Sequence, residues 1–364
     1  MRLVRWLAGW GRVLLRFLLG VLFTQFPLGA LLLAGWGQEV VRRAALREWA
    51  GANATPDLCA WPSFAMAEPH ENLEDGSRLR RGFRQLTGGL LRNARLALKG
   101  LFCTYCLTLP GVVLWAFSWR YGWDNSFNKG YEQAFIGPTL GISGIVLFII
   151  AMFYVPLAQA QLAVCGNVSS FFRWRVVRAV FMNNLHGVLW LALAYALAAL
   201  PINFLLAAVL FRFNESADVA AIPDAVFRST LDRYFFFAGM VALPLFAWVR
   251  VTAGRVYARG LRKAVKGNGQ DGLRIDEVNA AMLAKKSHPI RRTLLVPIAL
   301  LLVVIWFTFV AQIYVRQFLN YVPLRGWVVQ PLVHGPWLRY IPPHLNAETD
   351  GKLYPNDTFP EPPY

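Results

Sequence analysis

Long apolar stretches without acids, lysine or histidine dominate this chain. A helix of about 20 apolar residues can cross the hydrocarbon layer of a bilayer, because its backbone polar groups are satisfied within the helix. The only charged side chain in these stretches is Arg16, which is close to an end. We therefore predict an all-α membrane protein, a bundle of five or six transmembrane helices. The stretches are 13–36, 100–118, 135–160, 187–211, 234–249 and 293–315.

Every one of these stretches contains a proline, and glycines mark one of them. Proline removes a backbone donor and bends a helix, a defect that neighbouring membrane helices can absorb. Gly137, Gly141 and Gly144 form a surface of small residues that allows close contact between helices. We predict proline-kinked spans and favour compact packing over gating as the reason for both features. The prolines are Pro27, Pro110, Pro138, Pro156, Pro201, Pro244 and Pro297.

The chain is strongly basic, with 37 Lys and Arg against 20 Asp and Glu and a formal charge of +17. These residues concentrate between the apolar stretches, where the positive-inside bias and anionic headgroups explain them, so we predict no nucleic-acid partner. The basic segments 37–99, 161–186 and 250–292 are predicted to be cytoplasmic. The C-terminal tail then lies outside, in a multi-pass membrane protein.

The N-terminal stretch leaves two topologies open. Six complete crossings would put the N-terminus outside, whereas Arg2, Arg5, Arg12 and Arg16 favour the cytoplasm. The alternative has five true spans. In it, residues 1–36 form an interfacial helix and a re-entrant hairpin bent near Gly20 and Pro27. We slightly favour six spans.

Four regions follow from this pattern. Residues 1–36 form the N-terminal helix with a first span or re-entrant hairpin, and 37–99 form a cytoplasmic loop that ends in a basic amphipathic helix. Residues 100–318 form the transmembrane bundle. Residues 319–364, which include Pro342-Pro343 and Pro362-Pro363, form an extended proline-rich tail along the outer face.

Two basic amphipathic segments are the candidate contact sites. In 78–99, apolar residues recur at steps of three and four, and arginines fall largely on other positions of the helix. Such helices suit an anionic leaflet, and the segment 168–182 has a similar character. We expect these interfacial helices to contact the bilayer, its anionic headgroups or a protein partner. The candidate residues are Arg81, Arg84, Arg92, Arg95, Arg173, Arg175 and Arg178.

No constellation for catalysis, cofactor or metal binding emerges. Residues 267–272 match G-x-G-x-x-G, but they follow a basic helical stretch rather than the strand that a dinucleotide site requires. The five histidines are scattered. Asn183, Asn184 and His186 sit together where the fourth stretch meets the cytoplasmic face, and Asn183-Asn184 most simply cap a helix start. We expect no cofactor and no metal.

One pattern has a family likeness. The third stretch ends in Tyr154-Val155-Pro156-Leu157-Ala158-Gln159-Ala160-Gln161, and Gly35-Trp36 is followed by Val40-Val41-Arg42-Arg43. Together with Gly166, Phe171-Phe172-Arg173, Val176-Val177 and Asn183-Asn184, these motifs resemble an uncharacterised family of bacterial polytopic integral membrane proteins, a domain of unknown function. The resemblance covers about residues 10–265. The resemblance implies a multi-pass protein of a bacterial cytoplasmic (inner) membrane and brings no catalytic or binding residues.

Three functions remain open from the sequence. The first is a non-enzymatic scaffold or partner-binding membrane subunit that docks through its basic cytoplasmic helices. The second is a permease or channel for a neutral or lipid-like solute, lined by mid-span polar groups such as Thr104, Gln159, Asn203 and Gln312. The third and weakest is a lipid-modifying membrane enzyme that uses His186, with His288 approaching from the loop before the sixth stretch.

Overall fold

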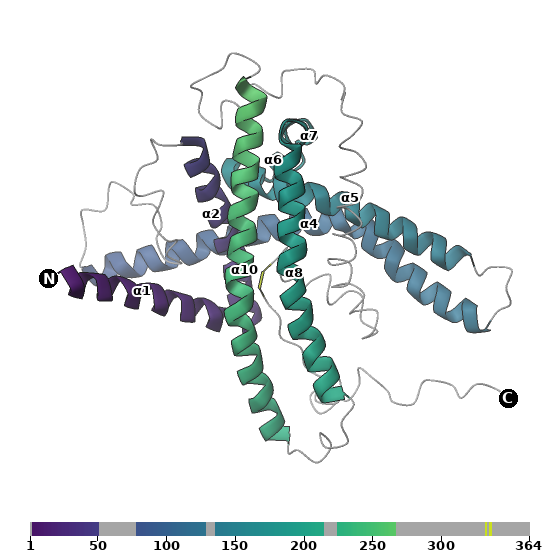
Figure 1. The fold of residues 1–364 in the computed structure, drawn as a ribbon, viewed down its shortest axis with the longest axis horizontal. Coiled ribbons are helices and arrows are strands. Elements are labelled where there is room, and N and C mark those ends of the chain that lie inside the picture. The colour runs from purple at the N-terminus through teal and green to yellow at the C-terminus, as the bar shows by residue number, and fades with distance from the viewer. Residues whose placement is uncertain are drawn as a thin grey trace.

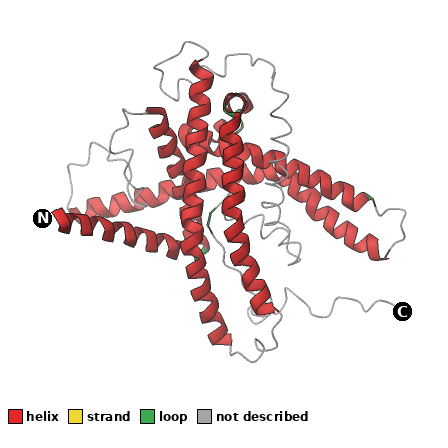
Figure 2. Cartoon of the chain, in the orientation of Figure 1, coloured by secondary structure: helices red, strands yellow, loops and turns green. Residues whose placement is uncertain are grey.

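The described part of the chain is helical throughout. The computed structural model describes residues 2–50, 78–128, 135–214 and 224–266, together with Leu332, Gly335 and Pro336. These ranges contain helices joined by short turns and no strand (Figure 2). The predicted all-α architecture is confirmed at this level. The helices are α1 (Arg2–Phe23), α2 (Pro27–Ala50), α4 (Arg78–Asn128), α5 (Ile136–Cys165), α6 (Val168–Phe171), α7 (Trp174–Asn183), α8 (Leu185–Asn214) and α10 (Asp224–Lys266).

Four helices are long and apolar enough to cross a bilayer. The candidate spans are Gly88–Ser118, Thr139–Cys165, Leu185–Ile202 and Arg228–Ala264, in α4, α5, α8 and α10. This set is compatible with a multi-pass membrane protein. Each of the four helices contains an internal proline, as the sequence predicts. The predicted sixth stretch, 293–315, lies outside the described residues.

The four long helices form two antiparallel pairs. α4 packs along α5, and α8 packs beside α10. In Figure 1 the α8–α10 pair runs vertically, whereas the α4–α5 pair crosses behind it and extends to the right. The short helix α7 is seen end-on at the top of α8, so α7 crosses the direction of that pair.

The N-terminal apolar stretch is a helical hairpin rather than one continuous helix. The break spans residues 24–26, and Pro27 is the first residue of α2, a position where its missing N–H costs nothing. The break is packed against α10: the Thr24 hydroxyl donates to the Val21 carbonyl at 2.6 Å, and the Gln25 amide donates to the Phe235 carbonyl at 3.1 Å. The helix break near Pro27 is the local feature that the hairpin alternative requires.

From this break α2 runs parallel to α10. Gln25 contacts Phe235, Trp36 lies against Phe246 with ring centroids 6.5 Å apart, and Glu48 binds Arg259. Residue numbers therefore rise together along the two helices. The C-terminal end of α2 consequently lies at the basic end of α10.

α4 is longer than the sequence suggests. The expected boundary between a cytoplasmic helix and a span, at 99/100, falls inside one unbroken helix, and Gly88-Gly89 does not interrupt it. Tertiary packing explains the difference, because Gly89 and Asn93 are buried in this part of the helix. A Cβ at Gly35 of α2 would lie only 1.9 Å from the Asn93 carbonyl oxygen, so the two backbones are in direct contact.

Glycine contacts join α4 to α5 further along the pair. A Cβ at Gly144 would lie 2.7 Å from the Gly111 carbonyl oxygen, and one at Gly111 would lie 2.8 Å from the Gly144 carbonyl oxygen. Gly141 faces Ser118 in the same way. Small residues at these points let the helix backbones touch, which favours association in lipid. The predicted glycine surface is therefore a packing surface.

Three residues of the C-terminal region are described, and all three are buried. Leu332 lies in the main apolar core, and the predicted tail along the outer face stays a prediction. Gly335 is also buried, and its backbone lies against the Ala30 carbonyl of α2. Apart from these residues and Pro336, the region 319–364 lies outside the described residues.

Replacing Gly144 with leucine should separate α4 from α5. The new side chain meets backbone atoms of α4 that cannot rotate away, so we expect a loss of about 1–3 kcal/mol in stability. The measurement is the midpoint of thermal unfolding in detergent. Gly11→Leu is the matched control, because nothing lies within 4 Å of a Cβ at that helical position. Equal midpoints for the two variants would contradict the backbone contact.

Candidate functional site

Polar contacts join neighbouring helices around the basic end of the bundle. Arg92 of α4 binds Glu39 of α2 at 3.1 Å. Lys99 of α4 donates to the Gly166 carbonyl, at the C-terminal cap of α5, at 2.8 Å. Gly166 has a φ of 75°, a left-handed conformation that favours glycine at a helix end. These contacts hold the part of α4 from Arg92 to Lys99 against both α2 and the end of α5.

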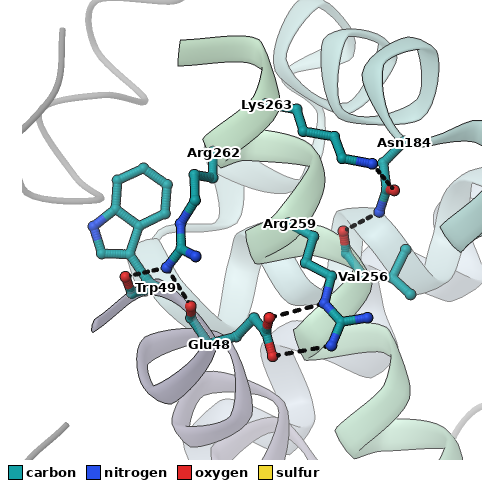
Figure 3. Close-up of polar contacts among 7 residues, drawn as sticks. All are labelled: Glu48, Trp49, Asn184, Val256, Arg259, Arg262 and Lys263. Carbon is teal, nitrogen blue, oxygen red and sulfur yellow. Dashed lines mark hydrogen bonds and ion pairs between the residues drawn. The ribbon is translucent and has the colours of Figure 1, made fainter. Parts of the chain in front are cut away.

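The close-up in Figure 3 shows how the end of α10 is attached to its neighbours. Arg259 forms a two-pronged ion pair with Glu48, with nitrogen–oxygen distances of 2.8 and 3.4 Å. Arg262 donates to the backbone carbonyls of Glu48 and Trp49 in the last turn of α2. A cation at this position satisfies carbonyls that have no partner within the helix and complements the helix dipole.

The junction between α7 and α8 is attached to the same helix. The Asn184 side chain donates to the Val256 carbonyl at 3.0 Å and accepts from Lys263 at 3.1 Å (Figure 3). A Cβ at Gly260 would lie 2.7 Å from a Val180 methyl group, so α7 and α10 approach closely here. Asn184 thus links α10 to the start of α8 instead of capping it with its side chain.

Arg250 lies at the centre of this end and is buried, with 1% of its surface exposed. Its guanidinium donates to the Gln159 carbonyl oxygen of α5 and lies 4.9 Å from the centroid of the Phe246 ring. The Gln159 amide donates to Thr104 of α4 at 2.9 Å. Tyr195 of α8 is also buried. The guanidinium therefore joins α10 to α5, and Gln159 extends this network to α4.

α2 completes the enclosure of Arg250. A Cβ at Gly37 would lie 2.7 Å from the Phe246 ring and 3.5 Å from Nε of Arg250. Any larger residue would push against the ring that stacks on the guanidinium. A second buried bond, from the Tyr257 hydroxyl to the Gln161 carbonyl oxygen, again joins α10 to α5.

The charge at this end is strongly one-sided. In 27–50, 88–99, 165–186 and 250–266, the only acids are Glu39 and Glu48. Glu39 already contacts Arg42, Arg43 and Arg92, and Glu48 contacts Arg259. Four arginines on three helices remain exposed around them: Arg95, Arg175, Arg178 and Arg255. The opposite end of α10 is mixed, with Asp224, Arg228, Asp232 and Arg233.

The predicted contact residues divide into three groups. Arg95, Arg175 and Arg178 are exposed, and Arg173 is half-buried. Arg92 binds Glu39 and so contributes to the attachment of α4 to α2. Arg81 and Arg84 lie in the first turns of α4, and their side chains are outside the described ones.

Other candidate residues serve packing where they are described. Thr104 and Gln159, expected to line a solute path, are hydrogen-bonded to each other in the core. Asn183 bonds back to the Ala179 carbonyl at 2.8 Å, and His186 is exposed. Among the described residues no group of three or more His, Cys, Asp or Glu could hold a metal. Gln312, His288 and residues 267–272 lie outside the described residues.

Sequence reasoning missed the burial of Arg250, because that residue directly follows the apolar stretch 234–249 and was counted with the cytoplasmic segment. The spacing of apolar residues around Arg250 does indicate its burial. Phe246, Ala253 and Tyr257 precede and follow Arg250 at helical spacing, and all three are buried. The helical period therefore puts Arg250 on the buried face of α10.

Comparison with known proteins adds no further identification. No protein family, curated protein or solved structure matches this chain. The resemblance to an uncharacterised bacterial family remains a prediction from the sequence.

A double-mutant cycle tests the Arg250–Gln159 bond. Gln159→Leu leaves a buried guanidinium without this acceptor, so we expect a loss of about 1.5–3 kcal/mol, the range for bonds to charged groups. In an Arg250→Met background the same substitution should cost much less, because the charge is gone. The measurement is the free energy of unfolding in mixed micelles.

Arg255→Met is the matched control for that cycle. It removes an exposed arginine one turn along the same helix and should change stability by no more than about 0.5 kcal/mol. Strictly additive effects of the two core substitutions would contradict the bond.

Proposed function

We propose that this chain is a non-enzymatic membrane scaffold, a subunit that binds an acidic partner protein through the basic extension of α4 and the basic C-terminal part of α10. The observation that carries the proposal is the continuity of these helices. α4 begins at Arg78, ten residues before its candidate span starts at Gly88. At 1.5 Å per residue this extension is about 15 Å long.

Both parts are basic, and the α10 part is also firmly attached. Residues 78–87 include Arg78, Arg80, Arg81 and Arg84 and no acid. The corresponding end of α10 includes Arg255 and Arg259 and is fastened to α2 and α8 by the contacts of Glu48 and Asn184. Charges held on rigid helices lose little conformational entropy when a partner binds. Complementary charge also speeds association and favours acidic surfaces.

We further propose the membrane placement of this end. The chain lies in a bacterial cytoplasmic membrane, an assignment supported by the resemblance over residues 10–265. The basic end faces the cytoplasm, in agreement with the positive-inside bias. Residues 1–50 form a re-entrant hairpin whose break lies beside Phe235, within the candidate span of α10. Arg2, Arg5, Arg12 and Arg16 then lie on the cytoplasmic side.

A partner should depend on the α4 extension. After cross-linking in native membranes and purification in mild detergent, Arg81→Glu with Arg84→Glu should reduce the yield of a specific partner about tenfold, because the charge complementarity is reversed. The matched control is Arg228→Glu with Arg233→Glu, near the other end of α10. The measurement is quantitative mass spectrometry of the purified material. Recovery of the chain alone, or equal losses in both variants, would overturn the scaffold proposal.

Reporter fusions test the proposed topology. A reporter before Met1 and one inserted after Lys266 should both be active only in the cytoplasm. A reporter after Tyr364 should be active only in the periplasm. Because the hairpin returns the chain to its starting side, the first two reporters must agree. Opposite locations for these two reporters would exclude the re-entrant hairpin and restore six complete crossings.

A further inference from the structure

We infer that α4 and the α6–α7 segment form a binding surface for anionic phospholipid headgroups. This headgroup surface consists of Arg95 on α4 with Phe172, Trp174, Arg175 and Arg178, and it goes beyond the proposed partner binding. All five side chains are exposed. The ligand class is the phosphate of an anionic phospholipid in the bilayer that surrounds the bundle.

The chain itself places α7 at a membrane interface. The candidate span of α5 ends at Cys165, and that of α8 begins at Leu185, so residues 166–184 connect two spans at one membrane face. In Figure 1 α7 is viewed along its axis, whereas α8 and α10 run vertically in the plane of the picture. A helix that crosses the direction of the spans, at the level where they end, lies along the membrane surface.

α7 has one buried face and one exposed face. Val176, Val177 and Val180 are buried against the bundle. At the helical spacing, Trp174, Arg175 and Arg178 fall on the opposite side, and Trp174 is 53% exposed. The Trp174 ring stacks on Tyr154 of α5 with centroids 4.1 Å apart, which fixes its position. A partly exposed tryptophan beside arginines is typical of the headgroup region.

The exposed face of α4 identifies lipid as the occupant. Leu98, Phe102, Leu109 and Val113 are exposed along one stripe of the candidate span, the surface that acyl chains cover. Arg95 lies on the same stripe, three residues before Leu98. Leu91, one turn before Arg95, is exposed on the same stripe, so Arg95 is a single basic residue within an apolar surface of the candidate span. A long arginine side chain in such a place extends toward the headgroups.

Contacts join α4 to the segment that leads into α7. α4 packs against α6, and Lys99, next to the exposed stripe, reaches the Gly166 carbonyl that begins the α5–α7 connection. No acid occurs in 78–99 or in 165–186. Phosphate oxygens accept well from guanidinium groups, which present several donors in one plane. The interleaved apolar side chains fit a lipid better than a soluble acidic protein segment.

Native mass spectrometry of the full chain tests this surface directly. The chain is purified in mild detergent and titrated with phosphatidylglycerol or phosphatidylcholine. The unmodified chain should retain phosphatidylglycerol preferentially. Arg175→Gln with Arg178→Gln should reduce this preference about tenfold, since each basic residue near the surface contributes to the attraction. Arg175→Lys with Arg178→Lys, which preserves the charge, should retain most of it.

A second control separates local binding from net charge. Arg228→Gln with Arg233→Gln removes the same charge near the other end of α10 and should leave the preference unchanged. Equal retention of both lipids by the unmodified chain, or equal losses in the two glutamine pairs, would overturn the inference. Native mass spectrometry separates the chain with bound lipid from the chain with a bound protein by mass, so the lipid result is independent of the scaffold proposal. If the lipid preference fails this test while a partner protein still co-purifies with the Arg175 and Arg178 variants, the lipid inference is overturned and the scaffold proposal stands.

Discussion

The bond between the Arg250 guanidinium and the Gln159 amide is the interaction on which the arrangement of this bundle depends. A guanidinium away from water must be surrounded by acceptors and polarisable groups, since a buried charge without them is very costly. Here the groups come from different helices: Gln159 from α5 and the Phe246 ring from α10 itself. Thr104 of α4 orients Gln159. Moving any one of these helices away would expose the Arg250 charge or leave it without a hydrogen-bond acceptor.

Glycine makes this convergence sterically possible. The α2 backbone reaches Phe246 only at Gly37, and the α2 and α10 backbones meet at Gly254, where a Cβ would lie 2.4 Å from the Val41 carbonyl oxygen. Apolar helices gain little from association in lipid, so close packing and hydrogen bonds carry the contact. The one-sided charge outside this core follows from the same arrangement: Glu39 and Glu48 hold arginines between helices, and the remaining arginines face the surroundings.

Much of this fold could be predicted from hydropathy, but the details that create the basic end could not. Hydropathy indicates spans near 100–118 and 187–211 because both stretches are apolar along their whole length. Tertiary contacts decided the rest. Gly88-Gly89 signals a helix break locally, yet packing near Gly35 keeps α4 continuous. Asn184 favours a capping role by its chemistry, yet its side chain bonds across to α10. Arg250 was assigned to the cytoplasm because hydropathy counts charge without regard to which helix face carries it.

Solid-state nuclear magnetic resonance of the unmodified chain in lipid bilayers measures the central contact most directly. With the arginine and glutamine side chains isotopically labelled, the contact appears as a correlation between an Arg250 guanidinium nitrogen and the Gln159 carboxamide carbon. The structure predicts that this correlation is present and that the Arg250 side-chain protons exchange slowly with deuterated water, because the group is buried. Absence of the correlation together with rapid exchange, as expected for Arg255 on the surface, would contradict a bundle built around Arg250.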